Sequence, residues 1–268
     1  MKGIEGKVAV VTGGASGIGA AACRHFAAAG ARVVIGDIDA ARAQALAIEI
    51  GEHCAWPFAF DAADTEQVRQ LVEQGAAHFG RLDFLFNNAA LVSRDVVKRD
   101  TNPVDIEFEI WDRVLAVNAR GYLAGCKYAI PHMLKAGGGA IVMTGSGSGL
   151  RGDLANIAYS ASKAAIMSLS RSVATIYGKQ GVRCNVINPG LIVTERGRET
   201  MAPAVRDVLQ RHTLTPRLGV PEDIAALVVH LCSDDGGFIT GQAISVDGGM
   251  QEHMPYYADF SSGKASWE

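Results

Sequence analysis

The sequence predicts an α/β fold with a single doubly wound domain, in which helices cover both faces of a parallel sheet of about seven strands. Short apolar runs alternate with longer helix-like segments almost from end to end. The runs are apolar along most of their length, which is typical of strands buried on both faces. The chain has 268 residues, and one α/β domain often runs to about 250 residues.

Seven runs rich in valine, isoleucine and phenylalanine are the expected strands. They are Val8–Val11, Arg32–Gly36, Ala55–Phe60, Leu82–Phe86, Ala140–Met143, Arg183–Ile187 and Ala243–Val246. The expected helices are Ile18–Ala29, Ala40–Ile50, Thr65–Phe79, Glu107–Leu134, Tyr159–Tyr177 and Pro221–Cys232. Gly30 and Gly51 are plausible C-terminal caps of the first two helices. Asp64 is a good N-cap for the third, and Pro221 suits the first turn of the last.

Three segments do not belong to this alternation. Thr194–Pro216 is helix-like but follows a late strand, where a substrate lid is expected, at about residues 194–216. Residues 251–268 form a C-terminal tail with four aromatic side chains. The loop Ser93–Asn102 carries five charged residues and is expected to be merely solvated.

Composition limits the partners and the compartment. Twenty-five basic against 28 acidic residues give a net charge of −3, which argues against a nucleic-acid partner. No apolar run approaches the roughly 18 residues needed to cross a membrane, and the first residues do not resemble a signal peptide. The five cysteines are widely spaced, which fits neither a disulfide framework nor a metal site. We therefore expect a cytoplasmic protein without metal, membrane or nucleic-acid partners.

A glycine-rich turn, Thr12–Gly19, joins the first strand to the first helix. Glycines allow a tight turn and let backbone N–H groups approach a pyrophosphate, which the helix N-terminus attracts. A P-loop is excluded because no Gly-Lys-Ser/Thr ends the turn. The turn residues expected to bind a dinucleotide are Gly13, Ser16, Gly17, Ile18 and Gly19.

Asp37 ends the second strand, 18 residues after Gly19. A carboxylate at this place accepts both ribose hydroxyls of NAD and repels the 2′-phosphate of NADP. Neither Ser16 nor Ile38, which lies beside the ribose, supplies a compensating cation. The alternative is a tight turn followed by an Asp that only caps a helix. The pairing of turn and carboxylate favours an NAD-binding domain over residues 1–250.

The glycines form G-x-x-x-G-x-G, and several further motifs follow in order. From Lys7 to about Met250 the sequence resembles the short-chain dehydrogenase/reductase family, in its classical subgroup, which implies a Rossmann fold. The motifs that carry the resemblance are Thr12–Gly19, Asp61-Ala62, Asn87-Asn88-Ala89-Ala90, Asn118, Ser146, Tyr159-Ser160-Ala161-Ser162-Lys163, Pro189-Gly190 and Val246-Asp247-Gly248-Gly249.

Tyr159 and Lys163 are four positions apart on an expected helix and therefore share one face. A nearby ammonium stabilises a phenolate, so we expect the pKa of Tyr159 to be lowered. Such a pair alone is usually a solvated helix face, but Ser146 lies 13 residues earlier. The resemblance implies that Ser146 hydrogen-bonds the substrate oxygen, Tyr159 exchanges its proton and Lys163 also binds the nicotinamide ribose. Ser148 is the rival for the role of Ser146, and otherwise faces the substrate.

Asn118 lies inside the expected helix Glu107–Leu134, where an asparagine is mildly unfavourable. A surface asparagine is the ordinary interpretation. The resemblance instead makes Asn118 the fourth catalytic residue, at a local helix break that anchors a water linked to Lys163.

The resemblance also implies the remaining cofactor contacts. Asp61 and Ala62 hold the adenine, and Asn88 and Ala89 line the adenosine ribose. Pro189, Gly190, Ile192 and Thr194 frame the nicotinamide. The family usually has glycine where this chain has Ala90, which leaves the local pocket shape open.

These residues predict an NAD-dependent alcohol dehydrogenase or ketone reductase. Its small-molecule substrate is expected to be a hydrophobic secondary alcohol, with cyclic and aromatic alcohols as candidates. The apolar residues expected at the pocket are Leu91, Val92, Leu150, Leu154, Ile192, Met201 and Val205.

The sequence disfavours two other functions. A serine hydrolase is disfavoured because the central residue of Gly145–Gly149 is Gly147 and not the nucleophile. A non-catalytic nucleotide-binding or regulatory protein on the same fold is disfavoured by the intact tetrad.

The resemblance also implies a homotetramer that uses the helices Glu107–Leu134 and Tyr159–Tyr177 and the last strand as interfaces. For the tail over residues 251–268, two placements remain open. It either crosses a subunit boundary and closes a neighbouring active site, or it packs on its own subunit or frays.

Overall fold

All seven expected strands are present in the computed structural model, which describes residues 1–194 and 202–267. They form one sheet in the order β3-β2-β1-β4-β5-β6-β7, and every neighbouring pair is parallel. The prediction of a doubly wound parallel sheet is therefore confirmed. The strands are β1 Val8–Thr12, β2 Arg32–Asp37, β3 Ala55–Ala59, β4 Phe84–Asn87, β5 Gly139–Thr144, β6 Val182–Pro189 and β7 Ala243–Val246.

The strand order reverses beside β1. In the register, Val10 of β1 lies between Val34 of β2 and Leu85 of β4, although β2 and β4 are far apart in the chain. At such a switch point the loops that leave the carboxyl ends of the strands diverge and open a crevice. The glycine-rich turn after β1 lies at this point of the sheet.

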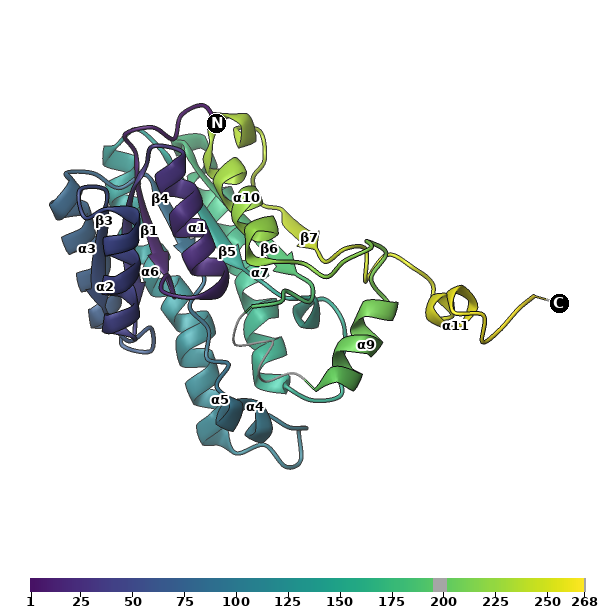
Figure 1. Ribbon diagram of the computed structural model, residues 1–268. Helices are drawn as coiled ribbons and strands as arrows, with labels where there is room; N and C mark the ends of the chain where they lie inside the picture. Colours follow the sequence, from purple (N-terminus) through teal and green to yellow (C-terminus); the bar gives the residue numbers. More distant parts are fainter. Residues whose placement is uncertain (195–201, 268) are drawn as a thin grey trace.

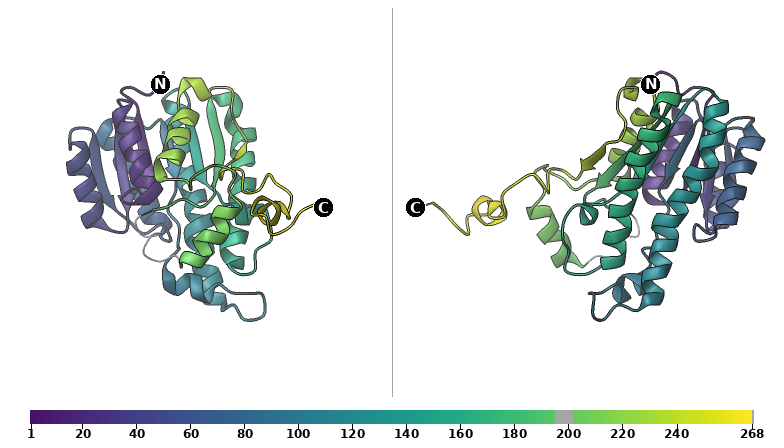
Figure 2. Two further views of the ribbon diagram at one scale, coloured as in Figure 1. Left: turned by 45° about the vertical axis from the view of Figure 1, so that its right-hand side comes forward. Right: turned by 180° about the vertical axis from the view of Figure 1, so that it is seen from behind.

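Helices cover both faces of the sheet (Figures 1 and 2). Helices α1, α2 and α10 pack on one face, and α3, α6 and α7 pack on the other. The described helices are α1 Gly17–Ala28, α2 Ala40–Ile50, α3 Thr65–Phe79, α4 Arg94–Arg99, α5 Phe108–Leu115, α6 Gly121–Lys135, α7 Ile157–Tyr177, α9 Pro203–Arg211, α10 Pro221–Cys232 and α11 Tyr257–Ser261.

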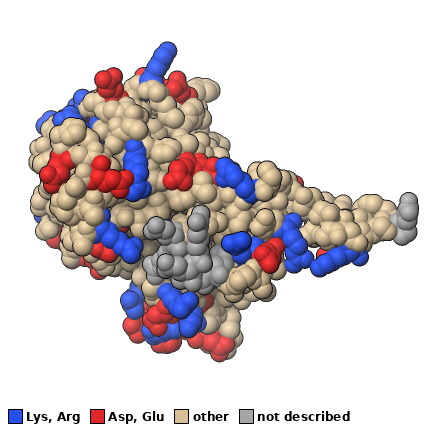
Figure 3. All heavy atoms as spheres, in the orientation of Figure 1, with Lys and Arg blue, Asp and Glu red and all other residues tan. Residues whose placement is uncertain are grey.

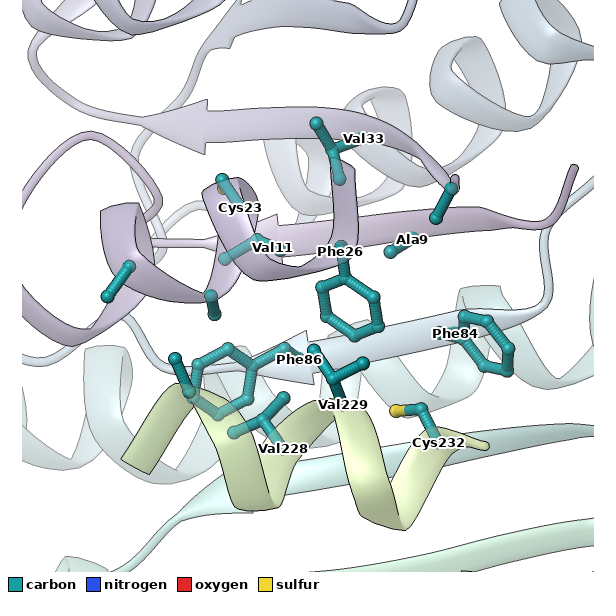
Figure 4. Close-up of a cluster of buried hydrophobic side chains, with 14 of the residues drawn as sticks. Ala9, Val11, Cys23, Phe26, Val33, Phe84, Phe86, Val228, Val229 and Cys232 are labelled. Carbon is teal, nitrogen blue, oxygen red and sulfur yellow. The ribbon is translucent and has the colours of Figure 1, made fainter. Parts of the chain in front are cut away.

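A cluster of fully buried apolar side chains joins α1 and α10 to the sheet (Figure 4). Phe26 of α1 stacks on Phe84 of β4 with ring centroids 5.9 Å apart. Val228 and Val229 of α10 lie beside Phe86 in the same cluster. This packing holds α1 against the sheet, so that its N-terminus lies at the carboxyl edge, where β1 ends.

Several expected helix ends are present. The Asp64 carboxylate accepts hydrogen bonds from the N–H groups of Glu66 and Gln67 at the start of α3. Pro221 is the first residue of α10. Gly30 has a φ of +87° and follows the C-cap Ala29, a conformation that glycine adopts without a steric penalty.

The structure corrects two sequence predictions. Glu107–Leu134 is not one continuous α-helix: a π-helical turn over Ala116–Arg120 separates α5 from α6 and contains Asn118, where the resemblance implied a local break. The loop Ser93–Asn102 is not merely solvated: it contains α4, and the side chains of Val96 and Asp100 are buried. The high charge of this segment gives no sign that Val96 and one of its own charged residues, Asp100, face inward.

The expected lid and tail lie at one end of the molecule. Helix α9 lies within the expected lid, and residues 195–201 of that lid, with Met201, are outside the described residues. Beyond β7 the tail extends away from the sheet and carries α11 at its far end (Figures 1 and 2). Its side chains Tyr256, Phe260 and Trp267 contact one another.

The visible surface carries both signs of charge (Figure 3). Acidic and basic side chains are interspersed over the body of the protein, without one continuous field of either sign on this face. Within residues 1–194 and 202–267, none of the helices combines the length and the apolar character that crossing a bilayer requires.

Candidate active site

The turn after β1 has a backbone that only glycine tolerates. Gly13 has a φ of +63°, and a Cβ there would lie 2.9 Å from the Cα of Ala89. A Cβ on Gly19 would lie 2.0 Å from the carbonyl oxygen of Gly13. Gly17 has a φ of +51°, and a Cβ there would lie 3.2 Å from Cγ2 of Thr194. These contacts pack the turn against β4 and against the segment after β6.

Asp37 holds this turn at the end of β2. Its Oδ2 accepts a hydrogen bond from the N–H of Ala15 at 2.9 Å, and its Oδ1 accepts one from the N–H of Asp39 at 3.0 Å. The carboxylate therefore lies directly beside the glycine-rich turn, in the position that the sequence assigned to the ribose contact. The exposed side chain of the adjacent Ile38 lines the same region.

Asn88 connects three segments of the site. Its Nδ2 donates to the carbonyl oxygen of Gly13 at 3.1 Å, and its Oδ1 accepts from the hydroxyl of Thr144 at 3.0 Å. The Thr12 hydroxyl accepts hydrogen bonds from the N–H groups of Asn88 and Ala89. Asn88 thus fixes the shape of the site through contacts that are internal to the protein.

A cavity of about 680 Å³ opens at the carboxyl ends of β2, β3 and β4. Asp61 lines it, and its Oδ1 accepts a hydrogen bond from the N–H of Ala63 at 2.8 Å. Ala63, the neighbour of Ala62, lies in the cavity wall. The residues that line it are Ile38, Asp61, Ala63, Leu91, Asp112, Arg113, Leu115, Ala116, Val117 and Arg120.

The segment after β6 approaches the glycine-rich turn from the other side. Gly190 donates to the carbonyl oxygen of Val246 at 3.0 Å, and a Cβ on Gly190 would lie 2.5 Å from the Cα of Asp247. Ile192 then bridges to Gly219. With Thr194 beside Gly17, Pro189–Thr194 and the turn form two walls of one site. A glycine cradle, an adjacent carboxylate and a cavity of this size fit a dinucleotide.

Lys163 is fully buried in α7, with 0% exposure. Its ammonium donates a hydrogen bond to the carbonyl oxygen of Thr144, with Nζ and O 2.6 Å apart. The same Nζ lies 5.4 Å from the ring centroid of Tyr159 and 5.2 Å from that of Tyr122. Burial without a carboxylate partner lowers the pKa of Lys163 to about 7.

The two candidate serines face different partners. Ser146 lies two residues beyond the end of β5, and it is close enough to Tyr159 to counteract part of the rise in the pKa of that phenol. Ser148 directs its hydroxyl at Asp153, with Oγ and Oδ2 3.3 Å apart. The N–H of Ser148 donates to the Ser146 hydroxyl. The structure therefore brings Ser146, and not its rival, to the phenol of Tyr159.

The pKa of Tyr159 differs from the sequence expectation. The adjacent ammonium of Lys163 was expected to lower it, but burial raises the pKa of the Tyr159 phenol, and the hydrogen bond to Ser146 offsets part of this rise. The difference arises because α7 withdraws the phenol from water while Lys163 directs its ammonium at Thr144. A buried phenolate is costly unless further positive charge reaches the site.

Asn118 lies in the π-helical turn and is fully buried. Its Oδ1 accepts a hydrogen bond from the N–H of Leu91 at 2.8 Å, and its Nδ2 donates to the hydroxyl of Ser162 at 3.2 Å. Ser162 in turn donates to the carbonyl oxygen of Tyr159. Asn118 therefore connects the loop after β4 to the helix that carries Tyr159 and Lys163. π-helical turns occur frequently at functional sites.

Comparison with known proteins decides the family. Residues 13–251 match a family model described as enoyl-(acyl carrier protein) reductase. A probable short-chain type dehydrogenase/reductase of Bradyrhizobium diazoefficiens is 46% identical over 268 residues, covering 99% of this chain and 95% of the relative. The D-threitol dehydrogenase of Mycolicibacterium smegmatis is 38% identical, covering 92% and 93%.

The similarity extends to solved structures. A 7α-hydroxysteroid dehydrogenase complexed with NADH and 7-oxo glycochenodeoxycholic acid superimposes with a TM-score of 0.85 at 30% identity, covering 92% of this chain and 94% of that one. This chain belongs to the short-chain dehydrogenase/reductase family.

This short-chain dehydrogenase/reductase also uses residues that sequence reasoning did not single out. Thr144 accepts from Lys163 through its carbonyl oxygen and donates to Asn88 through its hydroxyl. The only feature of the sequence that points to a role for Thr144 is its place at the end of β5, two residues before Ser146. Tyr122 packs beside Lys163, although the sequence suggested only an ordinary helix residue.

The apolar residues expected at the substrate pocket of this short-chain dehydrogenase/reductase differ widely in exposure. Leu154 is 99% exposed and therefore points into solvent. Leu150 and Val205 are exposed, whereas Leu91 and Ile192 are half-buried. In the described parts of the chain, no three His, Cys, Asp or Glu side chains gather as metal ligands.

Proposed function

We propose that this short-chain dehydrogenase/reductase oxidises a hydrophobic secondary alcohol with NAD and reduces the corresponding ketone in reverse. The observation that carries the proposal is the arrangement beyond the end of β5, where Ser146 lies beside the phenol of Tyr159 and Lys163 donates to Thr144. Lys163, one turn further along α7, is buried beside the Tyr159 ring. A phenol, a hydroxyl and an ammonium in one water-poor place form a proton-transfer site.

Each catalytic residue has a distinct role in this proposal. Ser146 hydrogen-bonds the substrate oxygen, and Tyr159 removes the proton of the alcohol. In its protonated form, which is lost as the pH rises through about 7, Lys163 places a positive charge beside the phenol. It also binds the nicotinamide ribose, while Asn118 anchors a water that links Lys163 to solvent. When bound, the oxidised nicotinamide accepts the hydride and adds positive charge to the site. The raised pKa of Tyr159 is consistent with a phenol that becomes an effective base only when the bound nicotinamide adds this positive charge.

The proposed cofactor is NAD rather than NADP. In support, the Asp37 carboxylate lies at the glycine-rich turn through its contact with Ala15. A second negative charge from a 2′-phosphate would be repelled there. The similar hydroxysteroid dehydrogenase structure contains NADH. The adenine is expected in the cavity beside Asp61, and the nicotinamide beside Pro189–Thr194.

The proposed substrate class is hydrophobic, with cyclic alcohols as the first candidates. Half-buried Leu91 packs against the apolar cluster beside Tyr159, and the similar solved structure holds 7-oxo glycochenodeoxycholic acid. The relative that acts on D-threitol shows that a small polyol is the alternative to test. Ser148, which faces Asp153, is expected at the entrance to the substrate site.

We also propose a homotetramer in the cytoplasm. Helices α5, α6 and α7 expose Phe108, Leu123 and Ile176, and Phe238 is exposed just before β7. Apolar side chains of this size on the expected interface elements support burial against further copies. The five cysteines are free, as is usual in a reducing compartment. Light scattering after size exclusion measures the assembly, and a monomer would contradict this part of the proposal.

The experiment is NADH formation by the purified protein, with NAD and then NADP, across secondary alcohols, cyclic diols, hydroxysteroids and threitol. Tyr159→Phe keeps the ring but removes the exchangeable proton, so we expect turnover to fall by about 100- to 10,000-fold. NADH binding by fluorescence is expected to remain. Tight NADH binding with no turnover in the whole panel would instead favour a regulatory nucleotide-binding protein.

A further inference from the structure

The catalytic helix α7 begins without a cap of its own. Its N-cap residue, Asn156, has a left-handed backbone with a φ of +61°, and its side chain makes no capping hydrogen bond. The first helical hydrogen bond runs from the N–H of Ser160 to the carbonyl oxygen of Asn156. The earlier N–H groups of a helix need partners from elsewhere in the protein.

Asp100 provides these partners from the end of α4. Its Oδ1 accepts from the N–H of Ala158, and its Oδ2 accepts from the N–H of Tyr159, both at 2.9 Å. Its backbone carbonyl oxygen accepts from the N–H of Asn156 at 2.8 Å. One residue, 56 positions before Asn156 in the sequence, therefore satisfies three of the four N–H groups at the start of the helix.

The contact is built into the protein interior. Asp100 is only 2% exposed. Beside it, Val96 of α4, Ile110 and Val114 of α5 and Ala158 of α7 form a small apolar cluster, and Tyr159 packs against this cluster. A carboxylate withdrawn from water makes strong hydrogen bonds to N–H groups, and a helix N-terminus favours its charge. Both effects fix the backbone of Tyr159.

We propose that Asp100 is a positioning residue for the dehydrogenase reaction: by binding the amides of Ala158 and Tyr159 it sets where the Tyr159 phenol stands relative to Ser146 and Lys163. This inference rests on the proposed function. Asp100 contacts no reacting atom in this scheme. Its effect on the rate passes through the first turn of α7, and its loss displaces the phenol without emptying the cofactor site.

Asp100→Asn tests this role, because the amide keeps the size of the side chain but places a donor group against one N–H. We expect kcat for alcohol oxidation to fall about 10- to 100-fold, as small displacements of a reacting group do. KM for the alcohol and the Kd for NADH are expected to stay within about twofold. A kcat within twofold of the parent would overturn the proposal, and so would a loss that appears entirely in KM.

Asp64→Asn is the matched control. Asp64 caps α3 in the same way, with N–H groups of Glu66 and Gln67 bound to its carboxylate, but on an exposed helix end. We expect this variant to lose stability and to keep kcat. An equal loss of kcat in both variants would show a general effect of removing a cap and would overturn a specific role for Asp100.

A measurement without cofactor or substrate separates this inference from the proposed function. In hydrogen exchange, the amides of Ala158 and Tyr159 should exchange about tenfold faster or more in Asp100→Asn, with α3 unchanged. Should that variant fail to fold, Asp100→Glu keeps the charge, shifts it by one methylene and is expected to lower kcat. Parent-like kcat and exchange in Asp100→Glu would overturn the proposal. An inactive parent would instead count against the proposed function alone.

Discussion

The unit from β1 to α1 differs from helix α9 and the tail in the exposure of its apolar side chains. Every residue of β1 is buried, and Phe26 of α1 is enclosed between the sheet and α10. Along α9 the side chains are exposed or half-buried, and Trp267 at the end of the tail is 80% exposed. The first region finds its partners within this chain, whereas the second presents its apolar surface outward.

This contrast separates the two halves of the proposed reaction. The cofactor walls, the tetrad and their connections through Asn88 and Thr144 are fixed by the packing of one subunit. The proposed substrate site depends on side chains that stay exposed in a single subunit, such as Leu150 and Val205. Variants in the two regions should therefore fail in different ways.

The largest effect is expected from Phe26→Ala in the buried region. Phe26 is fully buried and stacks on Phe84, so its loss removes apolar contact and leaves a cavity. We expect the free energy of unfolding to fall by about 3–5 kcal/mol, measured by denaturation in urea. Val208→Ala on α9 is the control, with a change within about 0.5 kcal/mol. Equal losses in both variants would contradict the comparison.

The next largest effect is expected at Asp37. Asp37→Ser removes the negative charge and the contact with Ala15. We expect the ratio of kcat/KM with NAD to that with NADP to fall about 10- to 100-fold, since hydrogen bonds to a charged group contribute about 1.5–3 kcal/mol. Asp39→Ser, which removes an exposed carboxylate two residues later, should leave the ratio close to that of the parent. An unchanged ratio in Asp37→Ser would show that other residues select the cofactor.

The pH dependence tests the proposed base, Tyr159 of α7. Because burial raises the pKa of Tyr159, the phenol is mostly protonated near neutral pH. Alcohol oxidation needs the deprotonated form, so kcat/KM should rise by up to about tenfold per pH unit below that pKa. Ketone reduction needs the proton and should fall only as the pH rises through and above that pKa. A flat profile for oxidation, with the chemical step shown to limit the rate, would count against Tyr159 as the base.

The smallest effect on stability is expected from ending the chain after Met254. Of the removed aromatic residues, Tyr256, Phe260 and Trp267 contact one another and Tyr257 contacts the retained His253. We therefore expect the free energy of unfolding to change by no more than about 1 kcal/mol. The same variant decides the placement of the tail. A raised KM or a smaller assembly would show that the tail reaches a neighbouring subunit, and unchanged values would dispose of closure by the tail.

The sequence predicts the buried region well, because strands and cofactor turn follow from local rules. Apolar runs such as Val8–Val11 match their strands to within a residue or two, and the glycines of the turn are required by its backbone. The choice of Ser146 over Ser148 follows from the spacing to Tyr159, and it is supported because Ser148 directs its hydroxyl at Asp153 while Ser146 lies beside Tyr159.

Other features have no local signal. The π-helical turn at Ala116–Arg120 changes the hydrogen-bond pattern without interrupting the apolar periodicity of the helix. Asp100 looks like one more charge in a charged loop, because its partners, Ala158 and Tyr159, lie more than fifty residues away in the sequence. The pKa of Tyr159 depends on burial, which only the packed protein determines. The π-helical turn, the partners of Asp100 and the pKa of Tyr159 all depend on tertiary structure.

The contacts of Asn88 have a thermodynamic consequence. Because one side chain joins the turn after β1 to the end of β5, the dinucleotide site exists only when β1, β4 and β5 are assembled together. A ligand that binds only this assembled state draws the folding equilibrium toward it, by about 2.7 kcal/mol at one hundred times its Kd. The amount of folded enzyme during heat or oxidant stress would then follow the size of the nucleotide pool, and the protein would be most durable where its cofactor is most abundant.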